Sequence, residues 1–120
     1  MPESVRNRPT SSTEELFLFA KNPSYYYDAD AVRADSGANL RNFWILGPEG
    51  GSTGHPAVFP KELARRCILL GSRVGDNVLD PFGGSGTTGL VARSLGRNST
   101  LVELNPAYAE IAEEQVCELA

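Results

Sequence analysis

Two carboxylates, Asp80 and Glu103, stand on either side of a glycine-rich run, and together they could bind a small polar ligand. The run that starts at Asp80 reads Asp-Pro-Phe-Gly-Gly-Ser-Gly-Thr-Thr-Gly and holds four glycines within seven residues. Glycine permits a positive φ and a close approach of a ligand to the backbone, and a helix that follows such a run presents N–H groups to that ligand. The run therefore predicts a pocket where a strand is followed by a helix.

Three ligand classes compete for this pocket. A phosphate-binding P-loop needs a Lys that closes the glycine run, but Thr87 and Thr88 follow Gly86 with no Lys in reach. A dinucleotide site is compatible with a literal G-x-G-x-x-G at 84–89 and with Glu103, which lies 19 residues beyond the first of these glycines. The third class is S-adenosylmethionine, whose ribose hydroxyls would also meet an acid at the end of the second strand.

Asp80 separates the two remaining ligands. A pyrophosphate is an anion that needs bare backbone N–H groups, so a carboxylate between strand and glycines repels it. A sulfonium cation with an adjacent ammonium is attracted by the same carboxylate, most strongly in a partly dry cleft. In a purely structural alternative, Asp80 and Pro81 only shape a turn and Glu103 ends a solvated strand. The pattern favours S-adenosylmethionine and leaves this alternative open.

The elements that must position these groups alternate along the second half of the chain. Apolar spacing, glycine stops and prolines at helix starts predict helices over 60–70, 87–95 and 106–119, with strands over 77–79 and 99–102 between them. Two strands joined by a helix lie parallel, as in half of a doubly wound α/β sheet. Upstream, the apolar run Leu16–Ala20 predicts one more buried strand.

Bulk composition bounds the class of protein. The 120 residues are 41% hydrophobic and carry a net charge of −4, which predicts one globular domain and argues against a nucleic-acid binder that relies on bulk charge. With no bilayer-length apolar run and a polar N-terminus, the expected location is the cytoplasm, without a membrane partner. Cys67 and Cys117 stand singly, so we expect reduced packing residues and no metal site.

Charge is unevenly distributed along the chain. Six basic and three acidic residues lie between Lys61 and Arg97, whereas the chain from Glu103 onward carries five Glu and no Lys or Arg. The arginines that could meet phosphates are Arg6, Arg8, Arg41, Arg65, Arg66 and Arg73.

At residues 80–88 the chain resembles the DNA methyltransferases that modify adenine N6 or cytosine N4, in the group whose cofactor motif follows the catalytic motif. Residues 55–60 (His-Pro-Ala-Val-Phe-Pro) are similar to the segment that lines the methionine end of the cofactor in that family. Residues 103–106 are similar to its ribose-binding strand end. The resemblance implies a partial Rossmann-like methyltransferase fold, a doubly wound sheet without its N-terminal catalytic strands, with S-adenosylmethionine as cofactor and double-stranded DNA as partner.

The resemblance also implies residue roles and a division of the chain. Residues 1–34 would form a strand pair with an arm, 35–56 a loop left from a target-recognition region, and 57–120 the cofactor-binding half. The implied cofactor-binding residues are Phe59, Pro60, Asp80, Pro81, Phe82, Gly83, Gly84, Ser85, Gly86, Thr87, Thr88, Glu103 and Asn105.

One departure from the family limits the prediction. The family's chemistry depends on a tetrapeptide of Asp, Asn or Ser, two prolines and an aromatic, and no two of the eight prolines here adjoin. We therefore expect the cofactor-binding part of a methyltransferase, with no catalytic residue of its own, that a second polypeptide completes. The alternatives are an inactive remnant that only binds cofactor or DNA and, more distantly, an NAD-binding module. A sheet without its flanking strands has an open edge, which predicts marginal stability or self-association.

Overall fold

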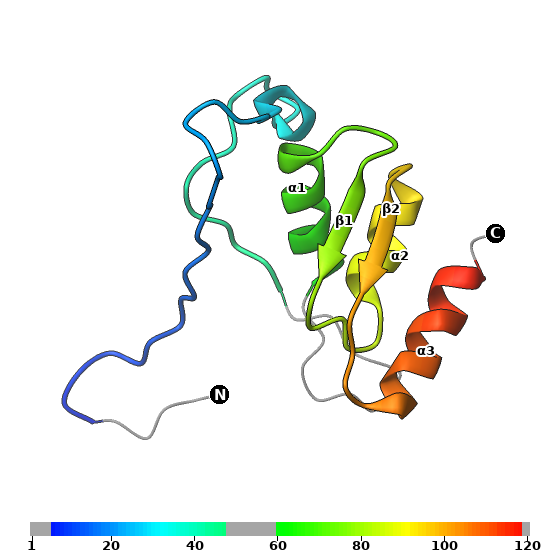
Figure 1. Ribbon diagram of the computed structural model, residues 1–120. Coiled ribbons are helices and arrows are strands. Elements are labelled where there is room, and N and C mark those ends of the chain that lie inside the picture. Colours follow the sequence, from blue (N-terminus) through cyan, green and yellow to red (C-terminus); the bar gives the residue numbers. More distant parts are fainter. Residues whose placement is uncertain (1–5, 48–59, 119–120) are drawn as a thin grey trace.

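The computed structural model describes residues 6–47 and 60–118, and its second part is a small α/β unit (Figure 1). The elements in chain order are the 3-10 helix η1 (Ala29–Val32), α1 (Lys61–Gly71), β1 (Asn77–Asp80), α2 (Thr87–Ser94), β2 (Asn98–Leu101) and α3 (Pro106–Cys117). The predicted alternation of helices and strands from residue 60 onward is confirmed, with ends that differ by one or two residues. The predicted helix end at 119 lies outside the described residues.

The two strands form a parallel sheet in which Asn77 pairs with Asn98 and Asp80 pairs with Leu101. Parallel pairing brings both carboxyl ends to one edge, so the turn after Asp80 and the turn after Leu101 are neighbours. A backbone hydrogen bond of 2.9 Å from the N–H of Val102 to the carbonyl of Asp80 extends the ladder to this edge. The arrangement is part of a Rossmann-like fold, as predicted.

The hydrophobic core lies on one face of this sheet. Val78 turns toward the core, while the next residue, Leu79, points to the other face and is 62% exposed. In Figure 1, α1 lies beside β1 and α3 lies beyond β2, and α2 contacts both of these helices. The core residues come from the facing surfaces of α1 and α2, and they are Ala64, Ile68, Val91 and Ala92, with Val78 and Leu95 packed against them.

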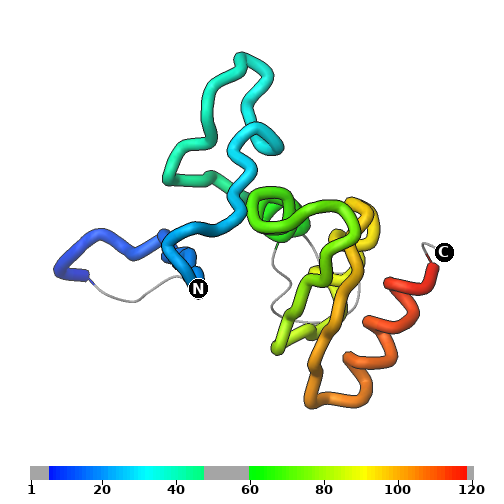
Figure 2. Tube along the Cα trace, turned by 45° about the horizontal axis from the view of Figure 1, so that its top comes forward, coloured from blue at the N-terminus to red at the C-terminus, as the bar shows by residue number. Residues whose placement is uncertain are grey.

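The N-terminal part of the chain attaches to the α/β unit through the C-terminal end of α1. The backbone N–H of Asp28 donates to the carbonyl of Leu70 at 2.9 Å, and the side chain of Asp28 caps η1 by accepting from the N–H of Ala31. The guanidinium of Arg73 lies 3.9 Å from the centre of the Tyr26 ring. These contacts anchor residues 26–32, whereas the preceding segment runs away from α2 and α3 (Figure 2).

Two predictions differ from the structure. The strand predicted at Leu16–Ala20 is not formed, because within the described residues no other strand pairs with it, and Phe19 is 88% exposed. The strand pair expected within residues 1–34 is therefore absent from its described part. Cys67 and Cys117 are free but exposed, so they are not the packing residues that their helical positions suggested.

Candidate functional site

The carboxylate of Asp80 organises the turn between β1 and α2. Its Oδ1 accepts a hydrogen bond from the backbone N–H of Phe82 at 2.9 Å, and its Oδ2 accepts one from the Thr88 hydroxyl at 2.6 Å. Each carboxylate oxygen has two lone pairs, so Asp80 keeps acceptor capacity beyond these bonds. The turn-shaping role and the ligand-binding role predicted for Asp80 are thus compatible.

Glu103 connects the end of β2 to the glycine run. Its Oε2 accepts from the backbone N–H of Gly84 at 2.8 Å, and its Oε1 accepts from the N–H of Asn105 at 2.8 Å. Gly84 has a φ of +54°, a left-handed conformation that glycine adopts without strain. The amide of Asn105 caps α3 by accepting from the N–H of Ala107 at 3.0 Å. The two carboxylates therefore stand at the ends of adjacent strands, on either side of one loop.

Four backbone donors of this loop are used within the protein. The N–H of Gly83 donates to the carbonyl of Val102 at 2.8 Å, and the N–H of Gly86 donates to the carbonyl of Gly83 at 3.0 Å. Together with the two bonds to carboxylates, this accounts for the N–H groups at positions 82, 83, 84 and 86. A pyrophosphate needs such groups bare, whereas a cation and hydroxyl donors need the carboxylates. These four donors are closed to a pyrophosphate, and the two carboxylates suit the cation and the hydroxyl groups of S-adenosylmethionine.

Three glycines of the run serve internal packing. A Cβ at Gly83 would lie 2.9 Å from the Cβ of Leu101, and one at Gly86 would lie 2.8 Å from the Cα of Ala112. A Cβ at Gly89 would lie 2.9 Å from Leu101 Cδ1 and 3.0 Å from a methyl group of Val116. Glycine at these positions lets β2 and α3 pack against the loop, a reason that differs from the close ligand approach predicted from the sequence.

The other predicted site residues lie in varied surroundings. Phe82 is 87% exposed at the tip of the turn, and Pro81 is also exposed. Ser85 and Thr87 are buried, so they hold the loop rather than face solvent. Pro60 is half-buried directly before α1. Phe59 lies outside the described residues.

A second feature, an arginine-rich cavity, has no counterpart among the predicted site residues. Residues 32–45 and the first half of α1 enclose a cavity of about 530 Å³, lined by Trp44, Phe43 and several arginines. The signal in the sequence is the single tryptophan of the chain, adjacent to a phenylalanine and close to Arg41. The sequence named Arg41, Arg65 and Arg66 among the arginines that could meet phosphates, but it placed residues 35–56 in a loop left from a target-recognition region and did not bring this loop together with α1.

No group of three or more His, Cys, Asp or Glu side chains in residues 6–47 and 60–118 is arranged to bind a metal ion. No helix in the same ranges is long and apolar enough to cross a membrane.

Comparison with known proteins finds relatives along nearly the whole chain. A family model described as DNA methylase, for N6 and N4 methyltransferases, matches residues 1–114. The Type II methyltransferase M.SmaI of Serratia marcescens is 46% identical over 96% of this chain and 41% of its own length. The Type II methyltransferase M.Cfr9I of Citrobacter freundii is 49% identical over 93% of this chain and 39% of its own length. The chain thus spans about two fifths of these relatives.

Two solved structures share the fold over most of this chain. The PvuII DNA methyltransferase, described as cytosine-N4-specific, superimposes with a TM-score of 0.64 at 29% identity and covers 75% of this chain and 35% of its own. The M1.HpyAVI–SAM complex superimposes with a TM-score of 0.57 at 30% identity and covers 89% of this chain and 46% of its own.

Proposed function

Because the chain belongs to the N6/N4 DNA methylase family, we propose that it is the cofactor-binding part of an enzyme that methylates an exocyclic amino group of DNA. The acceptor would be adenine N6 or cytosine N4, and the methyl donor S-adenosylmethionine. The observation that carries the proposal is the loop at 80–86, in which two carboxylates flank a turn whose N–H groups at 82, 83, 84 and 86 are bonded within the protein.

The residues of this loop suit the parts of that cofactor. S-Adenosylmethionine supplies a methyl group on a sulfonium centre, which an amine can displace in line. Asp80 would attract the positively charged end of the cofactor. Glu103 would accept hydrogen bonds from the ribose hydroxyls, and the charge of its carboxylate would strengthen these bonds. Thr88 holds the Asp80 carboxylate in place through its 2.6 Å hydrogen bond. The exposed Phe82 ring offers an apolar surface at the same turn.

The residues that receive the methyl group must come from elsewhere. No adjacent prolines occur in the 120 residues, so the tetrapeptide on which the family's acceptor chemistry depends is not among them. We propose that another polypeptide, or another part of a longer one, carries it and presents a base flipped out of duplex DNA. Flipping costs a few kcal/mol, which pocket contacts offset.

Calorimetric titration tests the cofactor assignment. The chain is titrated with S-adenosylmethionine and, separately, with NAD. We expect binding of the first only. Replacing Asp80 by Asn removes one charge-assisted interaction of about 1.5–3 kcal/mol, which corresponds to roughly 10- to 100-fold weaker binding. Binding of NAD without any response to S-adenosylmethionine would refute the proposal.

Asp76→Asn is the matched control for Asp80→Asn. Asp76 also sits in a turn next to β1 and accepts a backbone N–H, that of Arg73, at 2.8 Å, but it lies at the opposite end of the strand. Its replacement should leave the affinity unchanged. Glu103→Gln should weaken cofactor binding as Asp80→Asn does, because the amide that replaces the carboxylate has one acceptor oxygen fewer and no charge. Equal effects of the substitutions at 76 and 80 would show that the carboxylate has no direct role.

The absence of adjacent prolines also favours a second candidate, an inactive remnant that only binds cofactor or DNA. The two candidates separate in a methyl-transfer assay with labelled S-adenosylmethionine and duplex DNA. The assay also contains the part of M.Cfr9I that the chain does not match, which is about three fifths of that protein. Transfer that requires both polypeptides supports the completed enzyme. Cofactor binding without transfer supports the remnant.

A further inference from the structure

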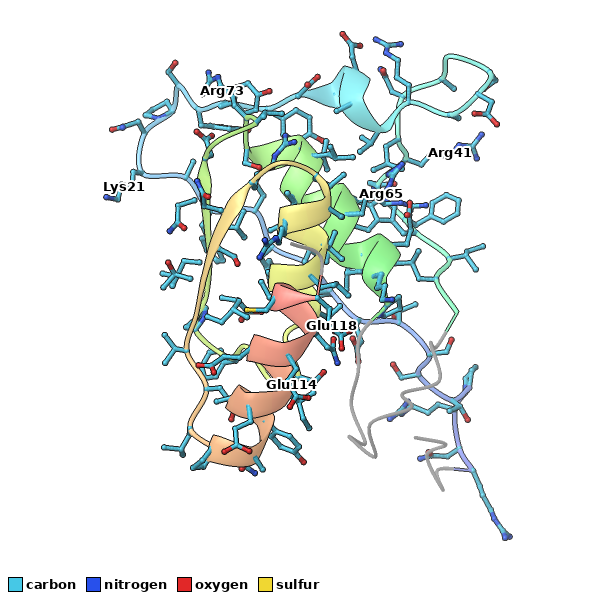
Figure 3. The ribbon with its side chains drawn as sticks, turned by 90° about the vertical axis from the view of Figure 1, so that its right-hand side faces the viewer. Lys21, Arg41, Arg65, Arg73, Glu114 and Glu118 are labelled. Carbon is cyan, nitrogen blue, oxygen red and sulfur yellow. The ribbon has the colours of Figure 1, made fainter. Side chains whose placement is uncertain are left out.

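The cavity beside α1 has a strongly basic lining. Four arginines (Arg33, Arg41, Arg65 and Arg66) and two aromatic rings contribute to it, and Glu62 is the one acidic residue among those that line it. Figure 3 shows Arg41 and Arg65 at the same corner of the molecule, between the loop and α1. In a chain with a net charge of −4, this concentration of positive charge sets the surface apart from the rest.

Two of the four arginines build the walls of the cavity. Arg33 is ion-paired with Asp30 and donates to the carbonyl of Gly37 at 2.8 Å. Arg66 donates to Glu62 at 2.9 Å, and its guanidinium lies 5.4 Å from the centre of the Trp44 ring. With only 21% of its side chain exposed, Arg66 fixes Trp44 rather than offering charge to a ligand.

The other two arginines present their charge to solvent. Arg41 is exposed, and within the described residues its guanidinium has no ion-pair partner and lies 6.0 Å from the centre of the Phe43 ring. Arg65 shares Glu62 with Arg66 at the longer distance of 3.6 Å, and 43% of its side chain is exposed. One carboxylate therefore faces two guanidinium groups on α1, and the cavity keeps a net positive charge.

A cluster of glutamates lies away from the cavity, at α3, whereas Asp30 and Asp35 lie near the cavity and Asp30 is paired with Arg33. Helix α3 carries Glu110, Glu113 and Glu114, and Glu118 follows its last residue. In Figure 1, α1 lies beside β1 and α3 lies beyond β2, so these glutamates are separated from the cavity by the strands and α2. A polyanion is therefore attracted to the cavity side and repelled by the α3 side. The first half of α1, which helps to line the cavity, begins at the end of the sheet where β1 and β2 stop, and the cofactor loop (residues 80–86) follows β1 at this same end (Figure 1).

We propose, building on the proposed function, that this cavity is a DNA-backbone site at which Arg41 and Arg65 each contact a phosphate. The planar guanidinium matches phosphate oxygens bidentately. Phe43, which is 60% exposed beside Arg41, adds an apolar face for a sugar or base. Trp44, fixed by its indole N–H bond of 2.9 Å to the carbonyl of Arg41, forms the floor of the site. Phosphate contacts of this kind orient the duplex without reading its sequence.

The single tryptophan makes the proposal testable at the site itself. The chain has one Trp, at position 44 in the cavity, so its intrinsic fluorescence reports on this cavity alone. We expect a 20-base-pair duplex to change this emission in parallel with its fluorescence anisotropy. The anisotropy titration is repeated at several salt concentrations. The slope of log affinity against log salt is negative, and each lost phosphate contact should make it shallower by about 0.9.

Three groups of variants complete the experiment. Arg41→Gln and Arg65→Gln should each reduce the slope by about 0.9, whereas Arg41→Lys and Arg65→Lys keep the charge and should keep the slope. Lys21→Gln is the matched control, because Lys21 is exposed and lies at the opposite side of the view from Arg41 (Figure 3). It should leave the slope unchanged.

The results that overturn the proposal are equally specific. They are a duplex that does not bind, an unchanged Trp44 emission on binding, or slopes that fall equally for Lys21→Gln and the arginine variants. Emission that responds to a completing polypeptide but not to DNA would assign the cavity to protein contact instead. Far-ultraviolet circular dichroism on the same samples shows whether each variant is folded. Calorimetry with S-adenosylmethionine then separates failure of the DNA site, with cofactor binding intact, from failure of the proposed function.

Discussion

Gly86 provides the sharpest test of how the cofactor loop is held, because two separate costs meet at this position. Its φ of +94° lies in the left-handed region, and an added Cβ would lie 2.8 Å from the Cα and 2.9 Å from the Cβ of Ala112 in α3. The obstacle includes backbone, so no side-chain rotation relieves it. Replacement by Ala therefore strains the backbone and forces α3 away from the loop.

Each cost has a magnitude and a control within the same chain. A non-glycine residue at positive φ costs about 1–2 kcal/mol, and an unrelieved overpacking contact costs about 1–3 kcal/mol. Gly86→Ala should therefore lower the free energy of unfolding by about 2–5 kcal/mol. Gly75 has a φ of +90° with nothing within 4 Å of an added Cβ, so Gly75→Ala measures the backbone cost alone. Gly83→Ala, crowded by Leu101 at 2.9 Å without a positive φ, measures the packing cost alone.

Urea denaturation followed by far-ultraviolet circular dichroism measures all three variants against the wild type. The same concentration of trimethylamine N-oxide is present throughout, so that the weakest variant starts folded. The effect of Gly86→Ala should approach the sum of the other two. If Gly86→Ala and Gly75→Ala agree within about 0.5 kcal/mol, which is the usual error of additivity, then α3 does not pack against the loop and the account of this glycine is wrong.

Two further predictions concern other side chains. Arg97 donates to the Ser72 hydroxyl at 3.2 Å, to the Ser72 carbonyl at 2.7 Å and to the Leu95 carbonyl at 2.6 Å. Arg97→Lys keeps the charge but cannot span these acceptors, so it should lower the free energy of unfolding by about 1–3 kcal/mol for two lost bonds, and a urea midpoint equal to wild type would contradict this. The side chain of Cys67 counts as exposed, but the burial of part of it raises the pKa of the thiol above its usual value, which lowers its thiolate fraction at a given pH. In single-cysteine variants, the rate of alkylation of Cys67 should therefore rise at higher pH than that of Cys117, and coincident pH profiles would contradict it.

The elements from residue 60 onward could be predicted because their signals are local. Helix α3 begins at Pro106 with Asn105 as its cap, and α2 follows directly on a glycine run, so each boundary is encoded within a few residues. The strand predicted at Leu16–Ala20 failed for the opposite reason. Its apolar pattern specifies a strand only when neighbours supply hydrogen bonds and cover both faces, and within the described residues nothing does.

The candidate site was predictable in its residue types and not in its internal contacts. The sequence places acids at 80 and 103 around a glycine run, and the parallel pairing of β1 with β2 follows from their connection. That Glu103 bonds to Gly84, or that Asp80 bonds to Thr88, depends on side-chain rotamers fixed by tertiary packing. The cavity at Trp44 was missed because its two walls, a loop and α1, are separated along the sequence, and no periodic pattern links them.

Cofactor binding and methyl transfer should depend differently on the rest of the enzyme, because the loop at 80–86 and the outer face of the sheet differ in their contacts. Every hydrogen bond described for this loop joins residues between 80 and 105, so the loop needs no further chain to take its shape. The face of the sheet that points away from the core does lack a cover among the described residues, because Leu79 is 62% and Val102 is 54% exposed there. Parallel sheets are normally covered on both faces. Cofactor binding should thus survive without the completing part, whereas methyl transfer should require the strands and helices that cover this face.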